Sequence, residues 1–164
     1  IEDQMEMIAF STIQELSISN SLSYEIVEEQ IKKLCSDEKI IRISFNKKVN
    51  FISKNKLKFL QKQIIQIVNS YHIKFPSRNG IPLEECRKST NLNFECFQIL
   101  IRNMELKSLL KISDAIISLP KHKSHLNSNQ MNEAKKFVKI LKEYNYTPAN
   151  KHRNIKRNTN LSNK

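Results

Sequence analysis

The chain has 164 residues, of which 28 are Lys or Arg and 16 are Asp or Glu, so its formal net charge at neutral pH is +12. No apolar run reaches the roughly 18 residues that a membrane-spanning helix needs, and the acidic first ten residues lack the pattern of a signal peptide. A single glycine cannot build a Gly-rich phosphate loop, and three cysteines at irregular spacing indicate a reduced, cytoplasmic protein rather than a disulfide framework.

The positive charge is unevenly distributed along the chain. Residues 1–52 have a net charge of −3, residues 53–120 of +6 and residues 121–164 of +9. A basic surface favours a polyanionic partner, and nucleic acid is the most plausible one. The alternative is a solvated Lys-rich surface that reflects an AT-rich genome.

The predicted elements repeat after 70 residues. Leu22-Ser-Tyr-Glu25 aligns with Leu92-Asn-Phe-Glu95, and the same offset aligns Ile31 with Ile101 without a gap. In the first copy we predict a short helix over residues 13–18, a polar turn over 19–21 and a longer helix over 23–35. Two strands follow, over residues 40–45 and 49–52, joined by Asn46-Lys47-Lys48.

A long helix is predicted next, over residues 53–71. Ser53 is its expected N-cap, and its apolar face consists of Leu57, Leu60, Ile64, Ile67, Val68 and Tyr71. No linker separates residue 52 from residue 53. We therefore expect the two copies to pack as a rigid rod.

The second copy contains the only glycine, Gly80. We expect Asn79-Gly80 to turn the chain because Gly tolerates positive φ, Ile81 to be a buried strand residue, and Pro82 to start the next helix. Helices are predicted over residues 83–88 and 93–106, and strands over 109–113 and 115–119 around Asp114. Helix, turn, helix and hairpin together form a winged helix.

The fold class predicted for the whole chain is mostly α, with small β wings, as tandem winged-helix domains of which the third is incomplete. The predicted divisions are residues 1–52, residues 53–120, the start of a third unit over residues 121–148, and a basic disordered tail over residues 149–164. The third unit consists of one helix, over residues 127–144.

The sequence contains no catalytic constellation. His122 and His125 are half of a possible metal site, but no further ligand pair lies nearby and the flanking lysines disfavour a cation, so we predict no metal. The paired acids Glu28-Glu29 and Glu84-Glu85 are interpreted as exposed helix faces.

Neither longer helix has the outer face of a DNA-reading helix, because the first is acidic and the second is close to neutral. The positive groups lie elsewhere. We predict contacts to an RNA backbone, with ordinary surface lysines as the alternative, for Lys47, Lys48, Lys54, Lys58, Lys62, Lys151, Arg153, Lys156 and Arg157.

Several motifs resemble the C-terminal part of the bacterial selenocysteine-specific elongation factor family, SelB. They are the stretches PSRNGIPLEECRKSTNLNFECFQILIRNM, DAIISLPKHKSHLNSNQ and KEYNYTP. The similarity is best over residues 53–148. The residues that match the family's motifs include Phe75, Arg78, Gly80, Glu84, Glu85, Arg87, Asp114, Leu119, Pro120, His122, Leu126, Gln130, Tyr146 and Pro148. The sequence departs from the family at Ser113, where Gly is usual, and from Asn150 onward.

The resemblance implies a factor with a GTPase body, which binds GTP and Mg²⁺, followed by four winged helices. Such a factor delivers selenocysteinyl-tRNA to the ribosome, and its last winged helix grips the mRNA hairpin that marks a recoded UGA. This chain would be a monomeric, cytoplasmic spacer without the GTPase or the hairpin reader, and so neither an enzyme nor the holder of a cofactor. Its partner would be RNA: the mRNA hairpin, tRNA or the ribosome.

Two other functions fit the pattern. A DNA-binding tandem winged-helix regulator would bind a specific sequence at moderate salt. A protein-interaction module without a nucleic-acid role would bind RNA weakly, and the acidic helix over residues 23–35 favours it.

Overall fold

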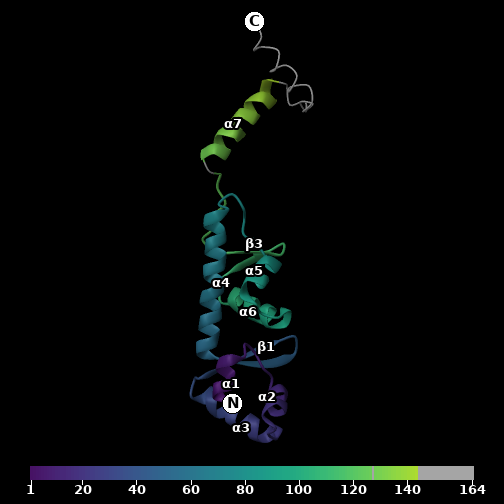
Figure 1. Cartoon of the computed structure of the whole chain (residues 1–164). Helices are drawn as coiled ribbons and strands as arrows, with labels where there is room; N and C mark the ends of the chain where they lie inside the picture. Colours follow the sequence, from purple (N-terminus) through teal and green to yellow (C-terminus); the bar gives the residue numbers. More distant parts are fainter. Residues whose placement is uncertain (127, 144–164) are drawn as a thin grey trace. The chain divides into compact units, whose positions relative to one another are not determined.

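The protein is described by a computed structural model over residues 1–126 and 128–143. It divides into two compact units, residues 1–124 and residues 125–164. The first unit contains two successive winged helices (Figure 1), and the second contains the described helix α7 (Ser128–Glu143). The predicted fold class, mostly α with small antiparallel wings, is confirmed.

The first winged helix comprises residues 1–53. Its helices are α1 (Glu2–Met7), α2 (Ile13–Asn20) and α3 (Tyr24–Ser36), and its wing is the antiparallel pair β1 (Ile40–Phe45) and β2 (Lys48–Ser53). Ser11 forms an isolated antiparallel bridge with Phe51, so it supplies the short strand expected between the first two helices of a winged helix. A first core fills the space between α1, α2, α3 and the wing and consists of Met5, Leu16, Val27, Ile31, Ile40 and Phe51.

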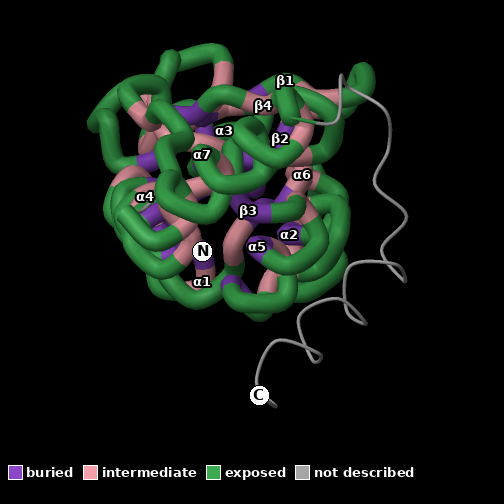
Figure 2. Tube along the Cα trace, turned by 90° about the horizontal axis from the view of Figure 1, so that it is seen from above, coloured by how far each residue is buried: buried purple, intermediate pink, exposed green. Residues whose placement is uncertain are grey.

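The second winged helix repeats this plan with a longer first helix. Its helices are α4 (Lys54–Lys74), α5 (Leu83–Thr90) and α6 (Phe94–Leu106), and its strands are β3 (Ile81–Pro82), β4 (Lys111–Ser113) and β5 (Ile116–Ser118). The strands form one antiparallel sheet in the order β3-β5-β4. In Figure 2 the buried parts of β3, α5 and α4 are coloured purple, and the outer side of α4 is exposed.

The predicted repeat reappears in the backbone. Ser21 and Asn91 both adopt positive φ at the ends of α2 and α5, and Glu38 and Ser108 do so after α3 and α6. These residues are also 70 positions apart. A left-handed residue after a helix lets the last carbonyls find amide partners. Helices α3 and α6 end by this same device, because the N–H groups of Glu38 and Ser108 both bond to a carbonyl of the last helical turn.

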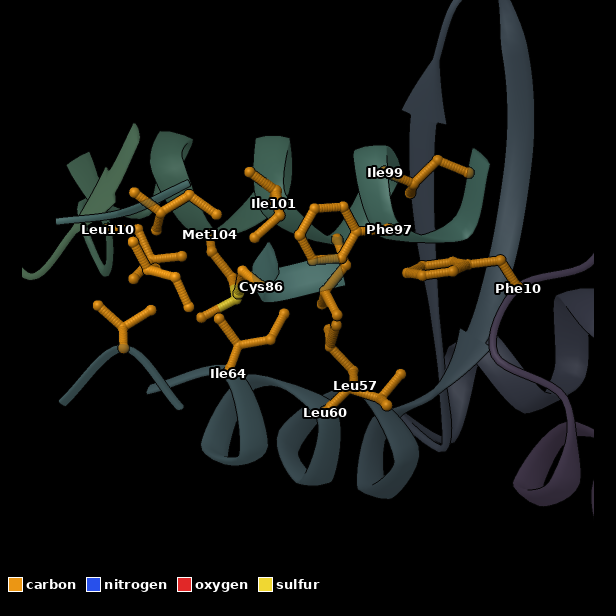
Figure 3. Close-up of a cluster of buried hydrophobic side chains, with 14 of the residues drawn as sticks. Phe10, Leu57, Leu60, Ile64, Cys86, Phe97, Ile99, Ile101, Met104 and Leu110 are labelled. Carbon is orange, nitrogen blue, oxygen red and sulfur yellow. The ribbon is translucent and has the colours of Figure 1, made fainter. Parts of the chain in front are cut away.

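A shared core joins the two winged helices (Figure 3). Side chains of α4 and α6, among them Leu57, Ile64 and Phe97, pack with Phe10, Ile43 and Ile52 of the first winged helix. Both faces of the β1–β2 sheet contribute to a core: Ile40 and Phe51 belong to the first core, and the alternate positions Ile43 and Ile52 to the shared core. With no linker between β2 and α4, the expectation of rigid packing between these two winged helices agrees with the geometry.

Polar residues lengthen the short helices beyond their predicted ends. Helix α2 runs to Asn20 because the Asn20 side chain donates to the Leu16 carbonyl over 2.7 Å. Helix α5 runs to Thr90, whose hydroxyl donates to the Arg87 carbonyl over 2.7 Å. The predicted first residues of α3 and α6, Ser23 and Asn93, are N-caps instead of helical residues.

The second wing is shorter than predicted. Leu109 is not a strand residue, because its N–H bonds to the Met104 carbonyl in the turn after α6. Ala115 lies with Asp114 in a two-residue turn at positive φ, and the Leu119 N–H donates to His72 instead of to a strand. In the first wing the turn is Asn46-Lys47, both at positive φ, so Lys48 begins β2.

The explanation predicted for Gly80 is wrong. Gly80 does not have positive φ. A Cβ at this position would lie 2.2 Å from the Ile117 carbonyl oxygen and 2.8 Å from Cγ2 of Ile116, both on β5. Gly80 is needed because the chain passes too close to β5 for any side chain. Ile81 is buried as predicted, and Pro82 is the N-cap of α5 instead of its first helical residue.

Helix α7 is the described part of the predicted third unit. Its bounds agree with the predicted helix over residues 127–144, whose end residues lie outside the described part, as does the predicted tail over residues 149–164. Of the helices in residues 1–126 and 128–143, none combines the length and apolar character needed to cross a membrane.

Candidate nucleic-acid interface

Helix α4 provides the basic face of the first unit. It contains five lysines and no acidic residue. Lys58 and Lys62 are exposed, one helical turn apart, and follow Lys54 on the same side of the helix. Among the described residues neither has a carboxylate within ion-pairing distance. Lys54 differs, because it pairs with Glu38 at 2.8 Å.

This arrangement is unfavourable for the helix itself. Like charges at i and i+4 repel each other by a few tenths of a kcal/mol per pair. Lysines in the first turn also oppose the helix dipole, which favours acidic residues there. A bound polyanion would remove both penalties, and the predicted RNA contacts of Lys54, Lys58 and Lys62 stay a prediction.

An exposed aromatic residue lies among these lysines. Phe59 is 61% exposed, and the Lys56 ammonium lies 6.0 Å from its ring centroid. Sequence reasoning missed Phe59 as a site residue, although its position off the apolar stripe of α4 marks it as exposed. Exposed aromatic rings between basic groups are the usual stacking platforms for unpaired bases.

The lysines of the first wing, Lys47 and Lys48, lie near the second winged helix and not on α4. Lys47 is exposed at the turn between β1 and β2, and Lys48 pairs with Glu95, near the start of α6, at 3.5 Å. The wing tip therefore approaches the second winged helix. The predicted RNA contacts of Lys47 and Lys48 stay a prediction, as do those of Lys151, Arg153, Lys156 and Arg157, which lie outside the described residues.

Neither α3 nor α6 is placed to read a groove of DNA. Helix α6 is approached by the first wing, because Phe45 and Asn46 line one hollow with Gln98, Ile101 and Arg102. Its Arg102 is held by Glu105 at 2.5 Å. Helix α3 exposes Glu25 and Glu29, which repel phosphates.

The motif residues Phe75, Arg78 and His122 form a clamp that fastens the loop between α4 and β3 to the end of the second wing. The Arg78 guanidinium lies 4.5 Å from the Phe75 ring centroid and donates to the Tyr71 hydroxyl over 2.6 Å. The Arg78 carbonyl and His122 Nε2 are 2.9 Å apart. These contacts give the motif a structural role.

His122 also stacks on a buried histidine. The rings of His72 and His122 are 3.5 Å apart at 15°, and the Leu119 N–H donates to His72 Nε2 over 3.2 Å. Burial and the neighbouring His122 lower the pKa of His72 below its ordinary value of 6.5. Over residues 1–126 and 128–143, no group of three His, Cys, Asp or Glu side chains is arranged to hold a metal ion.

The comparison with known families agrees with this architecture. Residues 65–119 match the family described as "Elongation factor SelB, winged helix". The matched stretch begins within α4 and ends just after β5, so it contains β3, α5, α6 and the second wing. No curated protein matches the chain. The chain therefore carries a SelB-type winged-helix region, formed by its second winged helix.

Proposed function

We propose that this chain is part of a selenocysteine-specific translation elongation factor, in which its winged helices act as a spacer between the GTPase body and the mRNA-hairpin reader. In this role it works in the cytoplasm and catalyses no reaction. GTP and Mg²⁺ belong to the GTPase body and not to this chain. The family match supports the assignment to the translation machinery.

The observation that carries the spacer role is the shared core. A spacer must hold its two ends at a fixed distance, and flexible joints defeat that purpose. Here one face of the wing sheet packs in the shared core, and β2 continues into α4 without a linker. Ser53 strengthens the junction, because its hydroxyl caps α4 at the Lys56 N–H and also donates to Glu6 of α1.

We further propose that α4 makes auxiliary contacts to an RNA backbone. Lys58 and Lys62 supply charge without an acidic partner among the described residues, and Phe59 supplies a stacking surface between them. The contacts would be insensitive to sequence, because they are made to the phosphate backbone and neither α3 nor α6 presents a base-reading face. They would assist the hairpin reader instead of replacing it.

Fluorescence anisotropy with a labelled selenocysteine-insertion hairpin and a scrambled hairpin tests this role. We expect both RNAs to bind alike and to weaken steeply as salt rises. Replacing Lys58 and Lys62 by Ala should reduce the slope of log K against log salt by about 1.5, since each lost phosphate contact lowers it by roughly 0.7–0.9.

The matched control replaces Lys32 and Lys33 by Ala, which removes the same charge from the acid-rich helix α3. If both double variants reduce binding equally, the effect is net charge and α4 is not the interface. A tenfold or greater preference for the cognate hairpin would place recognition in this chain and contradict the spacer role. Absence of binding to either RNA would leave protein interaction as the function.

A further inference from the structure

A groove on the first winged helix has no occupant within the described part of the chain. It has a volume of about 420 Å³ and lies between α3 and the β1–β2 sheet. Its lining residues are Ile13, Tyr24, Glu28, Ile31, Lys32, Cys35, Ser36, Arg42, Val49 and Phe51. Tyr24 at its edge is 50% exposed.

The second winged helix has the same groove at the same place. Five lining residues of the first groove have lining counterparts 70 residues later, in the second: Ile13 and Leu83, Glu28 and Gln98, Ile31 and Ile101, Lys32 and Arg102, Arg42 and Ile112. The second groove has three further lining residues: Phe97 of α6, and Phe45 and Asn46. Phe45 and Asn46 come from the tip of the first wing, and Phe45 packs against the shared core.

The second groove therefore shows what can pack beside such a groove. One of its walls is an aromatic side chain next to the two-residue turn of a β-hairpin, and the first groove has no such wall among the described residues. The first wing of this chain cannot fill the first groove as well, in the same molecule or in a second copy, because its tip is engaged with α6. The second wing cannot fill it either, because the Asp114-Ala115 turn has no aromatic residue at its flanks.

The rim of the first groove differs from that of the second in charge. Arg42 stands where the second groove has Ile112. Glu28 already pairs with Lys32 at 3.3 Å, so it does not neutralise Arg42. An acidic side chain next to the aromatic anchor would complement this rim.

We propose that the first groove binds the tip of a β-hairpin from another protein or domain, one that carries an aromatic residue and an acidic residue beside its turn. The hairpin would pack against the first winged helix in the way that the tip of the first wing packs against α6 of the second winged helix. This surface lies on α3 and the wing sheet, apart from the lysine face of α4, so the inference does not depend on RNA binding.

The probe is a disulfide-cyclised hairpin peptide with the sequence of residues 41–49, in which the two lysines are replaced by Asp. Cys35 lines the groove and is partly exposed, and Cys96 is an internal reference outside it. We expect about 1 mM peptide to slow iodoacetamide alkylation of Cys35 at least twofold, as a weak transient contact should, while Cys96 reacts unchanged.

Two controls make the result decisive. A peptide in which the Phe is replaced by Ala should not protect Cys35. The variant Arg42→Ile, which places the residue of the second groove in the first, should still be protected but should lose the preference for the Asp peptide over the Lys peptide. Unchanged alkylation of Cys35, or equal protection by the Phe-less peptide, would overturn the proposal.

Discussion

Gly80 shows how a single residue can be required by space instead of by backbone conformation. We expect Gly80→Ala to lower the free energy of unfolding by roughly 1–3 kcal/mol, because its Cβ would force β3 away from the Ile117 carbonyl. Urea denaturation monitored by circular dichroism measures the change.

The exposed neighbour provides the control for this substitution. Asn79→Ala should change stability by less than about 0.5 kcal/mol, as surface substitutions usually do. If Gly80→Ala is tolerated equally well, the close approach of β3 and β5 is not a constraint on this residue.

The buried histidine makes stability depend on pH. The pKa of His72 is lower in the folded protein than its ordinary value of 6.5, so the unfolded chain binds the proton more readily. The contribution of His72 is therefore complete above pH 6.5 and is lost as the pH falls below it. Protonation would also convert the Nε2 acceptor of the Leu119 N–H into a donor.

Urea titrations between pH 8 and pH 5 test this direction. His72→Gln should have a flatter dependence of unfolding free energy on pH over this range, even if it is less stable at pH 8. An equal slope in the variant and the original protein would show that another group causes the loss.

Phe59 separates stacking from charge on the same helix. Phe59→Ala should weaken binding to unpaired RNA by about tenfold, since one base–aromatic stack contributes ~1–3 kcal/mol. Ile73→Ala is the matched control, because Ile73 is 74% exposed on α4 and has no ring. Anisotropy titrations that find equal losses in both variants would exclude a stacking role for Phe59.

At the scale of elements, the lysine spacing of α4 predicts opposite effects on stability and binding. In Lys58→Glu the new carboxylate can pair with Lys54 and Lys62, one turn away on each side. We expect a gain in helix stability of roughly 0.5–1 kcal/mol, because two repulsive pairs become attractive. Affinity for RNA should fall by about tenfold, because a phosphate contact becomes a repulsion.

Thermal denaturation and anisotropy on the same samples measure both effects. The reference variant is Lys33→Glu, at an exposed position of α3. It makes the same change in net charge away from α4, so it measures the effect of long-range electrostatics alone. A variant at Lys58 that gains stability and keeps full RNA affinity would show that the lysines serve no backbone contact.

The helices could be predicted from the sequence more closely than the strands, for a physical reason. Apolar spacing marks α4 and α6 clearly, because each buries one continuous face. Strand ends depend on partners far away in sequence. Leu119 bonds to His72, and Ser11 pairs with Phe51, and neither pairing has a local signal. Helix α1 was missed because its six residues bury only Met5.

The candidate site was only partly predictable. The charge pattern indicated Lys58 and Lys62, since their spacing and lack of acidic neighbours on α4 are visible in the sequence. The engagement of Lys48 and Lys54 with Glu95 and Glu38 was not, because those carboxylates come from other elements. The exposure of Phe59 could have been predicted from helical phase.

At the scale of the first compact unit, the shared core packs the two winged helices against each other, so we expect them to unfold as one cooperative body. Their stabilities should therefore be coupled, although each has helices of its own. Leu100 of α6 is fully buried in the shared core and does not belong to the first core around Ile31. A cavity at Leu100 should thus weaken both parts, at a cost of roughly 2–5 kcal/mol.

Native-state hydrogen exchange of the whole chain, with and without Leu100→Ala, tests the spacer account most directly. The account predicts that the core amides of α3 and α6 open with one common free energy, and that the substitution lowers both by the same amount. If the α3 amides keep their protection while those of α6 lose it, the two winged helices are independent bodies and do not form a rigid spacer.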